Sequence, residues 1–158
     1  MHKPLSWGVL ATGSIATAFA KALHETETGI LAAAGSRTAE SARDFLNQTG
    51  HPGAKPCGCY EAILEEEAVE AVYIATPHPL HAEWAIKAAE AGKHVFCEKP
   101  LGMNMREAKA ICDAARRNNV VLMETFMYRS FTRTRKLWEL IRDGAIGEVR
   151  AIETNFAF

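Results

Sequence analysis

Apolar runs of strand length alternate with segments of helical periodicity along most of this chain, and no other feature limits its fold so strongly. Strands joined by helices form βαβ units, whose strands lie parallel in one sheet. The pattern therefore predicts an α/β fold with a Rossmann-type doubly wound parallel sheet. The expected strands cover residues 6–11, 30–36, 69–75, 94–97 and 120–123. The expected helices cover residues 14–24, 39–48, 81–91 and 104–117.

Two stretches depart from this regular alternation. Residues 49–59 carry two prolines and three glycines near one another, which predicts a loop with at most one short edge strand. After residue 123, residues 131–143 have the pattern of a helix and residues 148–158 that of a long strand. We expect residues 1–123 to form the Rossmann domain and residues 124–158 to begin an incomplete C-terminal α/β domain.

Composition limits the partners of the chain. Its 158 residues carry 18 basic and 19 acidic side chains, so it has no long-range attraction for nucleic acid or an anionic membrane. No apolar run approaches the roughly 18 residues of a membrane span, and the N-terminal residues lead straight into a strand instead of a signal peptide. We therefore expect a cytoplasmic protein without nucleic-acid or membrane partners.

Cysteine and histidine spacing does not indicate a disulfide framework or a metal site. Cys57 and Cys59 flank one glycine, and we expect the cysteines to be reduced structural thiols. His78 and His81 have an H-x-x-H spacing without a third ligand in view, so no metal is expected. His81 is instead interpreted as a helix-entry residue.

Residues 11–16, Ala-Thr-Gly-Ser-Ile-Ala, separate the first strand from the first helix and fit the fingerprint G-x-G-x-x-G/A except at its first position. Gly13 would allow the backbone to approach a pyrophosphate, which the following helix N-terminus attracts. Thr12, Gly13, Ser14 and Ile15 are therefore candidate cofactor-binding residues. Ala11 implies either that no positive φ is needed here or that the turn is slightly looser than usual. A tight turn without a ligand is the alternative.

Ser36, Arg37 and Thr38 follow the second strand, roughly twenty residues after the fingerprint. Binders of NAD usually place an acidic residue there for the ribose hydroxyls, whereas hydroxyls and a guanidinium suit a 2′-phosphate. The cofactor is therefore expected to be NADP, with NAD less favoured. The alternative is that Ser36 and Thr38 cap the second helix while Arg37 is solvated.

Three further stretches, residues 73–81, 91–101 and 124–129, occur in an order and spacing that resembles a known family. It is the glucose-fructose oxidoreductase, inositol dehydrogenase and rhizopine catabolism family (Gfo/Idh/MocA). Within it, the sequence is most similar to the branch of dimeric dihydrodiol dehydrogenases and NADP-dependent xylose dehydrogenases. The resemblance covers essentially the whole chain.

The resemblance implies roles for individual residues. Lys99, in Glu98-Lys99-Pro100, matches the lysine that contacts the nicotinamide ribose and the substrate and assists proton transfer, so it is the candidate catalytic residue. Thr76, Pro77 and His78 match a segment beside the cofactor, although asparagine is common where His78 stands. Glu98 and Arg129 also match positions near the cofactor.

The physical argument for Lys99 agrees with this role. A lysine at the carboxyl end of a parallel strand lies where open α/β sheets bind ligands, and a nearby oxidised nicotinamide would lower its pKa. Such a lysine can donate to a substrate oxygen and join a proton relay. Glu98 is expected to orient Lys99 or to support it from behind.

The expected function is NADP-dependent hydride transfer between the nicotinamide and a hydroxyl or carbonyl carbon of a small substrate, a sugar or a cyclic diol. The resemblance implies that the principal acid/base and the substrate pocket belong to the incomplete C-terminal domain, so this part alone is expected to be inactive. It also implies a homodimer or higher homo-oligomer for the full-length protein. A non-catalytic NADP-binding sensor would not need Lys99, and a methyltransferase should not carry Ser36-Arg37.

Overall fold

Six parallel strands form one sheet in the computed structural model, which describes residues 3–155. Their order is β3-β2-β1-β4-β5-β6. The strands are β1 (Leu5–Leu10), β2 (Gly29–Gly35), β3 (Lys55–Cys57), β4 (Ala71–Ile74), β5 (His94–Cys97) and β6 (Leu122–Glu124). This is the doubly wound Rossmann order, so the predicted fold class is confirmed.

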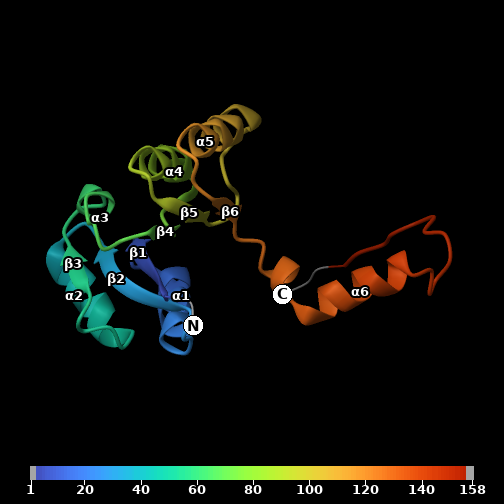
Figure 1. The fold of residues 1–158 in the computed structure, drawn as a ribbon, viewed down its shortest axis with the longest axis horizontal. Coiled ribbons are helices and arrows are strands. Elements are labelled where there is room, and N and C mark those ends of the chain that lie inside the picture. Colours follow the sequence, from blue (N-terminus) through green and yellow to red (C-terminus); the bar gives the residue numbers. More distant parts are fainter. Residues whose placement is uncertain (1–2, 156–158) are drawn as a thin grey trace. The chain divides into compact units, whose positions relative to one another are not determined.

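Helices cover both faces of the sheet (Figure 1). They are α1 (Ser14–His24), α2 (Ala39–Gln48), α3 (Glu61–Leu64), α4 (His81–Glu90) and α5 (Met105–Arg117), with the short 3-10 helix η1 (His78–Leu80) before α4. One hydrophobic core joins α1 and α2 to the sheet, and a second core joins α3, α4 and α5 to its other face. In the sheet, the strand order reverses between the neighbouring strands β1 and β4. This is the switch point where such sheets bind ligands.

The central strands are apolar because helices bury them on both sides. All of β4 is buried, and Val9, Leu10 and Ile74 have no exposed surface. The weak segment at residues 49–59 holds β3 as a short edge strand paired with β2, as predicted. The four-residue helix α3 was not predicted, since so short a helix has no periodicity to detect.

A second compact unit begins at Phe126 and is described here by itself. It contains the 3-10 helix η2 (Met127–Ser130) and α6 (Thr132–Arg142), which agrees with the predicted helix. The predicted strand over residues 148–158 is wrong for residues 148–155, which are not in a strand. A strand requires a neighbour for its backbone hydrogen bonds, and none pairs with this segment in the described part of the chain. Residues 156–158 lie outside the described residues.

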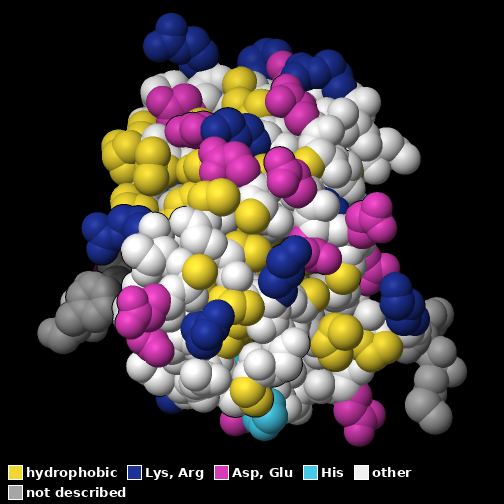
Figure 2. All heavy atoms as spheres, turned by 90° about the vertical axis from the view of Figure 1, so that its left-hand side faces the viewer, with side chains coloured by type: hydrophobic (Ala, Val, Ile, Leu, Met, Phe, Trp, Pro, Cys, Tyr) yellow, Lys and Arg dark blue, Asp and Glu magenta, His cyan; other side chains and the backbone are white. Residues whose placement is uncertain are grey.

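Charges of both signs share the protein surface. Figure 2 shows Lys and Arg side chains lying among Asp and Glu side chains over the face drawn. Lys87, for example, lies 2.6 Å from Glu83 and 3.7 Å from Glu61. Within residues 3–155, every helix is too short or too polar to cross a membrane.

Candidate functional site

The carboxyl ends of the strands lie side by side along one edge of the sheet. Leu10 of β1 is level with Gly35 of β2 and with Ile74 of β4. Ile74 is level with Cys97 of β5, which is level with Glu124 of β6. Backbone hydrogen bonds continue this ladder beyond the strands, from Ala11 to Gly35, from Glu98 to Ile74 and from Thr125 to Cys97. The segments that follow these strands, which hold most of the predicted site residues, are therefore neighbours.

The fingerprint turn has a strained backbone at its first position. Ala11 has a φ of 78°, in the left-handed region that costs an L-residue about 1–2 kcal/mol. The interpretation that this position needs no positive φ is therefore wrong. Backbone hydrogen bonds hold the turn on both sides, because Ala11 N–H donates to Gly35 O at 3.0 Å and Ala75 N–H donates to Leu10 O at 3.1 Å. The surrounding sheet imposes the conformation that glycine adopts more easily.

Gly13 leaves open space at the start of α1. Its φ is −76°, and an added Cβ would meet no atom of residues 3–155 within 4 Å, so neither conformation nor packing in this part of the chain requires glycine. No side chain caps α1, whereas Thr38 caps α2 and Asn104 caps α5. The N–H groups of Ser14 and Ile15 consequently have no helical acceptor. Open space beside free N–H donors fits a pyrophosphate.

Thr12 and Ser36 connect the fingerprint turn to the end of β2. Their hydroxyl oxygens lie 3.2 Å apart, and Ser36 is buried. Thr38 accepts a hydrogen bond from the Ser41 N–H at 3.1 Å, so it caps α2 as the sequence suggested. Ser36 instead serves as the link between the two segments.

Arg37 is exposed and lies between Ser36 and Thr38 in the sequence. No ion pair is recorded for it within residues 3–155. Its guanidinium lies near Tyr60: burial raises the pKa of the Tyr60 phenol, and the charge of Arg37 opposes that rise. Arg37 can therefore offer its charge and its donors to an anion at this edge.

Thr76 follows β4 and has a buried hydroxyl with no hydrogen-bond partner in the described part of the chain. Leaving a buried hydroxyl unpaired costs about 1–3 kcal/mol, so this group is available to a ligand. Pro77 and His78 come next and are exposed at the start of η1.

The segment Glu98-Lys99-Pro100 follows β5, with a cis peptide bond before Pro100. Lys99 is exposed. Glu98 Oε1 accepts a hydrogen bond from the Tyr73 hydroxyl at 2.7 Å, and Glu98 Oε2 accepts from the Lys99 backbone N–H at 3.2 Å. Glu98 therefore holds the backbone of Lys99, and no ion pair joins it to the Lys99 ammonium among the described residues.

Two buried groups beneath this segment have shifted pKa values. Burial raises the pKa of Tyr73, and the hydrogen bond to Glu98 raises it further, so the phenol stays protonated and donates. Burial also raises the pKa of Cys97 to about 12, and the charges of Glu124 and Glu98 act in the same direction. The Cys97 thiol is accordingly an inert core group at neutral pH.

Sequence reasoning missed two residues at this edge. His81 is the first residue of α4, as expected of a helix-entry residue, but it is fully buried. Its ring nitrogens lie 2.9 Å from Thr76 O and 2.7 Å from Pro100 O. Glu124 Oε1 accepts a hydrogen bond from the Leu101 N–H at 2.8 Å. Both residues lie in stretches that carry the family resemblance, residues 73–81 and 124–129, but no local pattern showed which backbone groups their side chains would contact.

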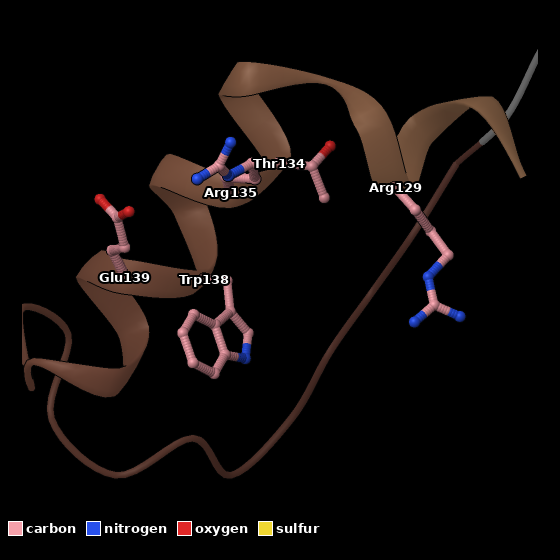
Figure 3. Close-up of a pocket in the computed structure, with 5 residues that line it drawn as sticks. All are labelled: Arg129, Thr134, Arg135, Trp138 and Glu139. Carbon is pink, nitrogen blue, oxygen red and sulfur yellow. The ribbon is translucent and has the colours of Figure 1, made fainter. Parts of the chain in front are cut away.

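The second unit carries Arg129 together with a surface pocket (Figure 3). Arg129 extends from η2, and α6 contributes the other residues, which are Thr134, Arg135, Trp138 and Glu139. Trp138 is largely exposed, and the Arg142 guanidinium lies 4.8 Å from its ring centre. The predicted position of Arg129 near the cofactor stays a prediction.

A family model supplies the identification. The model described as "Oxidoreductase family, NAD-binding Rossmann fold" (GFO_IDH_MocA) matches residues 5–126. The chain belongs to the Gfo/Idh/MocA oxidoreductase family. The resemblance inferred from residues 73–81, 91–101 and 124–129 is therefore confirmed.

Other members of the Gfo/Idh/MocA family match nearly the whole chain. A trans-1,2-dihydrobenzene-1,2-diol dehydrogenase of Danio rerio is 33% identical over 154 residues, 96% of this chain and 46% of that protein. A D-xylose 1-dehydrogenase (NADP(+)) of Haloferax volcanii is 36% identical over 154 residues, 98% of this chain and 46% of that protein. These relatives belong to the branch expected from the sequence.

A solved structure agrees with this assignment. The crystal structure of a 3-ketoreductase from Actinomadura kijaniata in complex with NADP has a TM-score of 0.84 and 35% identity, covering 93% of this chain and 46% of that one. The chain thus spans under half the length of these Gfo/Idh/MocA relatives.

Proposed function

We propose that this chain is the cofactor-binding part of an NADP-dependent oxidoreductase acting on a sugar or a cyclic diol. The observation that carries this proposal is the common edge of the sheet, where the fingerprint turn, the Arg37 segment and the Lys99 segment are neighbours. Relatives named as diol and xylose dehydrogenases, and a ketoreductase in complex with NADP, support the reaction class and the cofactor.

The fingerprint turn would hold the pyrophosphate of NADP. Gly13 leaves room for the phosphates, and the free N–H groups of Ser14 and Ile15 donate to their oxygens. Thr12, tied to Ser36, fixes the turn against the end of β2. Arg37, with the hydroxyls of Ser36 and Thr38 on either side, would bind the 2′-phosphate that distinguishes NADP from NAD.

The nicotinamide half would lie over β4 and β5. The unpaired hydroxyl of Thr76 would donate to the cofactor, with Pro77 and His78 beside it. The bound nicotinamide supplies or accepts the hydride. Lys99 would hold the nicotinamide ribose and the substrate oxygen and pass a proton to that oxygen, while Glu98 fixes the Lys99 backbone.

The rest of the catalytic site would come from a second domain. We propose that residues 124–158 begin this domain and that Arg129 contributes to cofactor binding. Hydride transfer needs the reacting carbon about 3–3.5 Å from the nicotinamide, which requires a second wall to hold the substrate. That wall would also supply the principal acid/base, and the whole protein would be a homo-oligomer.

Titration of the protein with NADPH and with NADH, followed by cofactor fluorescence, tests the cofactor assignment. The proposal predicts a Kd for NADPH at least about tenfold below that for NADH, the value of one charged hydrogen-bond partner. The Arg37→Ala variant should lose this preference by weakening NADPH binding alone. Arg43→Ala removes another exposed arginine on the neighbouring α2 and is the matched control.

Two results would contradict the proposal. Negligible binding of both cofactors would remove the assignment of the edge as a dinucleotide site. A preference for NADH, or an Arg37→Ala variant that still prefers NADPH, would refute the role given to Arg37.

A further inference from the structure

Side chains contact the backbone of Lys99 and of the two residues that follow it. Lys99 N–H donates to Glu98 Oε2 at 3.2 Å, and Leu101 N–H donates to Glu124 Oε1 at 2.8 Å. Between them, Pro100 O lies 2.7 Å from His81 Nδ1. The holding side chains come from the segment after β5, from β6 and from α4. We call this arrangement of Glu98, His81 and Glu124 the lysine clamp.

His81 joins two of the segments that meet at the sheet edge. Its side chain is fully buried, and its second ring nitrogen lies 2.9 Å from Thr76 O. Carbonyl oxygens only accept, so each ring nitrogen can serve here only as a donor. A protonated ring makes both bonds at once, and a neutral ring makes one. In both states the buried ring lies between the Thr76 carbonyl, which follows β4, and the Pro100 carbonyl, which follows Lys99.

Glu124 acts from the opposite side of the loop. It is the last residue of β6, and its neighbour Thr125 donates its backbone N–H to Cys97 O at 2.9 Å. The carboxylate that receives the Leu101 N–H therefore projects from a strand end anchored beside β5. The loop that follows β5 is fixed to both of its neighbouring strands, to β4 through His81 and to β6 through Glu124.

The Lys99 side chain has no such support. It is exposed, and no salt bridge to it is found within residues 3–155. A lysine ammonium sits on a flexible four-carbon stem, so the place of its backbone decides where it can reach. Displacements of about 1 Å at a reacting group can cost a hundredfold in rate.

We propose that His81 and Glu124 are positioning residues that fix the backbone of Lys99 so that its ammonium reaches the nicotinamide ribose. The inference rests on the proposed function, because it takes Lys99 as a cofactor contact. Neither residue touches the cofactor in this account: each acts through Lys99. A purely structural role would stabilise the fold without depending on the ammonium of Lys99.

A double-mutant cycle on NADPH binding separates these two roles. Glu124→Met removes the acceptor for Leu101 N–H at similar size, and Glu124→Gln keeps an acceptor oxygen. Glu124→Met should weaken NADPH binding by about three- to tenfold, the worth of one hydrogen bond, and Glu124→Gln by less than about twofold. In a Lys99→Met background, Glu124→Met should change the Kd by less than about twofold, because the contact it positions is gone. Glu90→Met, which removes an exposed carboxylate on α4, is the control.

His81→Gln provides the second arm and keeps the test decisive if Glu124→Met fails to fold. Glutamine has one donor group in place of two ring nitrogens, so it cannot reach both the Thr76 and the Pro100 carbonyl. It should therefore weaken NADPH binding in the parent and have less effect in the Lys99→Met background. Equal weakening with and without Lys99 would overturn the inference, as would a Glu124→Gln variant as weak as Glu124→Met. A parent protein that binds no NADPH would instead overturn the proposed function, whereas normal binding by every clamp variant overturns the clamp alone.

Discussion

The fingerprint turn and the Lys99 loop lie at the same edge of one sheet but are built in opposite ways. In the turn, the N–H groups of the first helical residues have no acceptor among residues 3–155, and a Cβ on Gly13 would meet none of the described atoms within 4 Å. In the loop, the N–H groups of Lys99 and Leu101 and the carbonyl of Pro100 all have side-chain partners. The turn thus leaves the N–H groups of the first residues of α1 free. In the loop, the backbone groups are bound by side chains, and the Lys99 side chain is free.

This contrast matches two kinds of contact that a dinucleotide needs. A phosphate group has several oxygens and is bound well by free backbone donors at a helix N-terminus. A reacting centre needs one group in one place, which a fixed backbone provides. Backbone hydrogen bonds to the neighbouring strands hold the turn despite the strained φ of Ala11, and side-chain hydrogen bonds hold the backbone of the loop.

The largest effect is expected from filling the open turn. Gly13→Asp places a carboxylate at the N-cap of α1, where φ is ordinary and no protein atom is near. Aspartate is a good N-cap, so the free energy of unfolding should rise by a few tenths of a kcal/mol. NADPH binding should fall by about a hundredfold or more, because like charges placed together cost several kcal/mol. Thermal unfolding and cofactor fluorescence measure the two effects.

The control for this variant is Gly53→Asp. Gly53 is also exposed, and a Cβ there would likewise meet no protein atom. This substitution should leave NADPH binding unchanged. A Gly13→Asp protein that binds NADPH as tightly as the parent would show that the space beside Gly13 is not a phosphate site.

The buried Cys97 thiol, which lies directly before the Lys99 loop, predicts that the protein loses stability at alkaline pH. The pKa of Cys97 is raised by burial to about 12 from 9.0, so above pH 9 the unfolded state releases a proton that the folded state keeps. The free energy of unfolding should therefore fall as the pH rises from 9 toward 12, by at most about 1.4 kcal/mol per pH unit from this thiol. The raised pKa of Tyr73 acts in the same direction.

Urea unfolding at pH 8, 9, 10 and 11 measures this loss. Cys97→Ala should make the decline shallower, whereas Cys59→Ala, which removes an exposed thiol, should not. An identical decline in the Cys97→Ala protein would mean that the thiol does not contribute to the loss of stability. The Cys97 side chain beneath the loop would then not be shielded from water.

A smaller effect is expected from relieving the strain of the turn. Ala11→Gly removes the Cβ from a residue with φ of 78°, and should stabilise the protein by about 1 kcal/mol, or about 2–4 °C in Tm. Ala110→Gly lies in the middle of α5 and should have the opposite sign, costing roughly 0.5–1 kcal/mol. Differential scanning calorimetry compares them. If both variants lose stability alike, the turn does not store strain in solution.

Local sequence patterns were sufficient for the doubly wound parallel sheet and for the capped helices. The fold follows from alternating periodicity, and the caps Thr38 and Asn104 were visible as residue types at helix starts. The φ of Ala11 was missed because its neighbours in the sheet impose it, against the preference of the residue itself.

Local sequence patterns could not predict side-chain contacts between distant segments. The partners of His81 lie at residues 76 and 100, and Glu124 reaches residue 101, so only the assembled sheet brings these groups together. The strand expected over residues 148–158 failed over residues 148–155 for a related reason. An apolar alternation shows which face a strand would bury, but a strand also needs a neighbour to pair with.

The central claim is that the turn and the loop bind the two halves of one cofactor, and amide NMR shifts of the protein on addition of NADPH test it most directly. The account predicts the largest shifts at Gly13, Ser14 and Ile15 and at Lys99, all saturating with a single Kd, and smaller shifts at Ser14 when NADPH is added to Gly13→Asp. Shifts confined to one of the two segments, or saturating with two different Kd values, would contradict it.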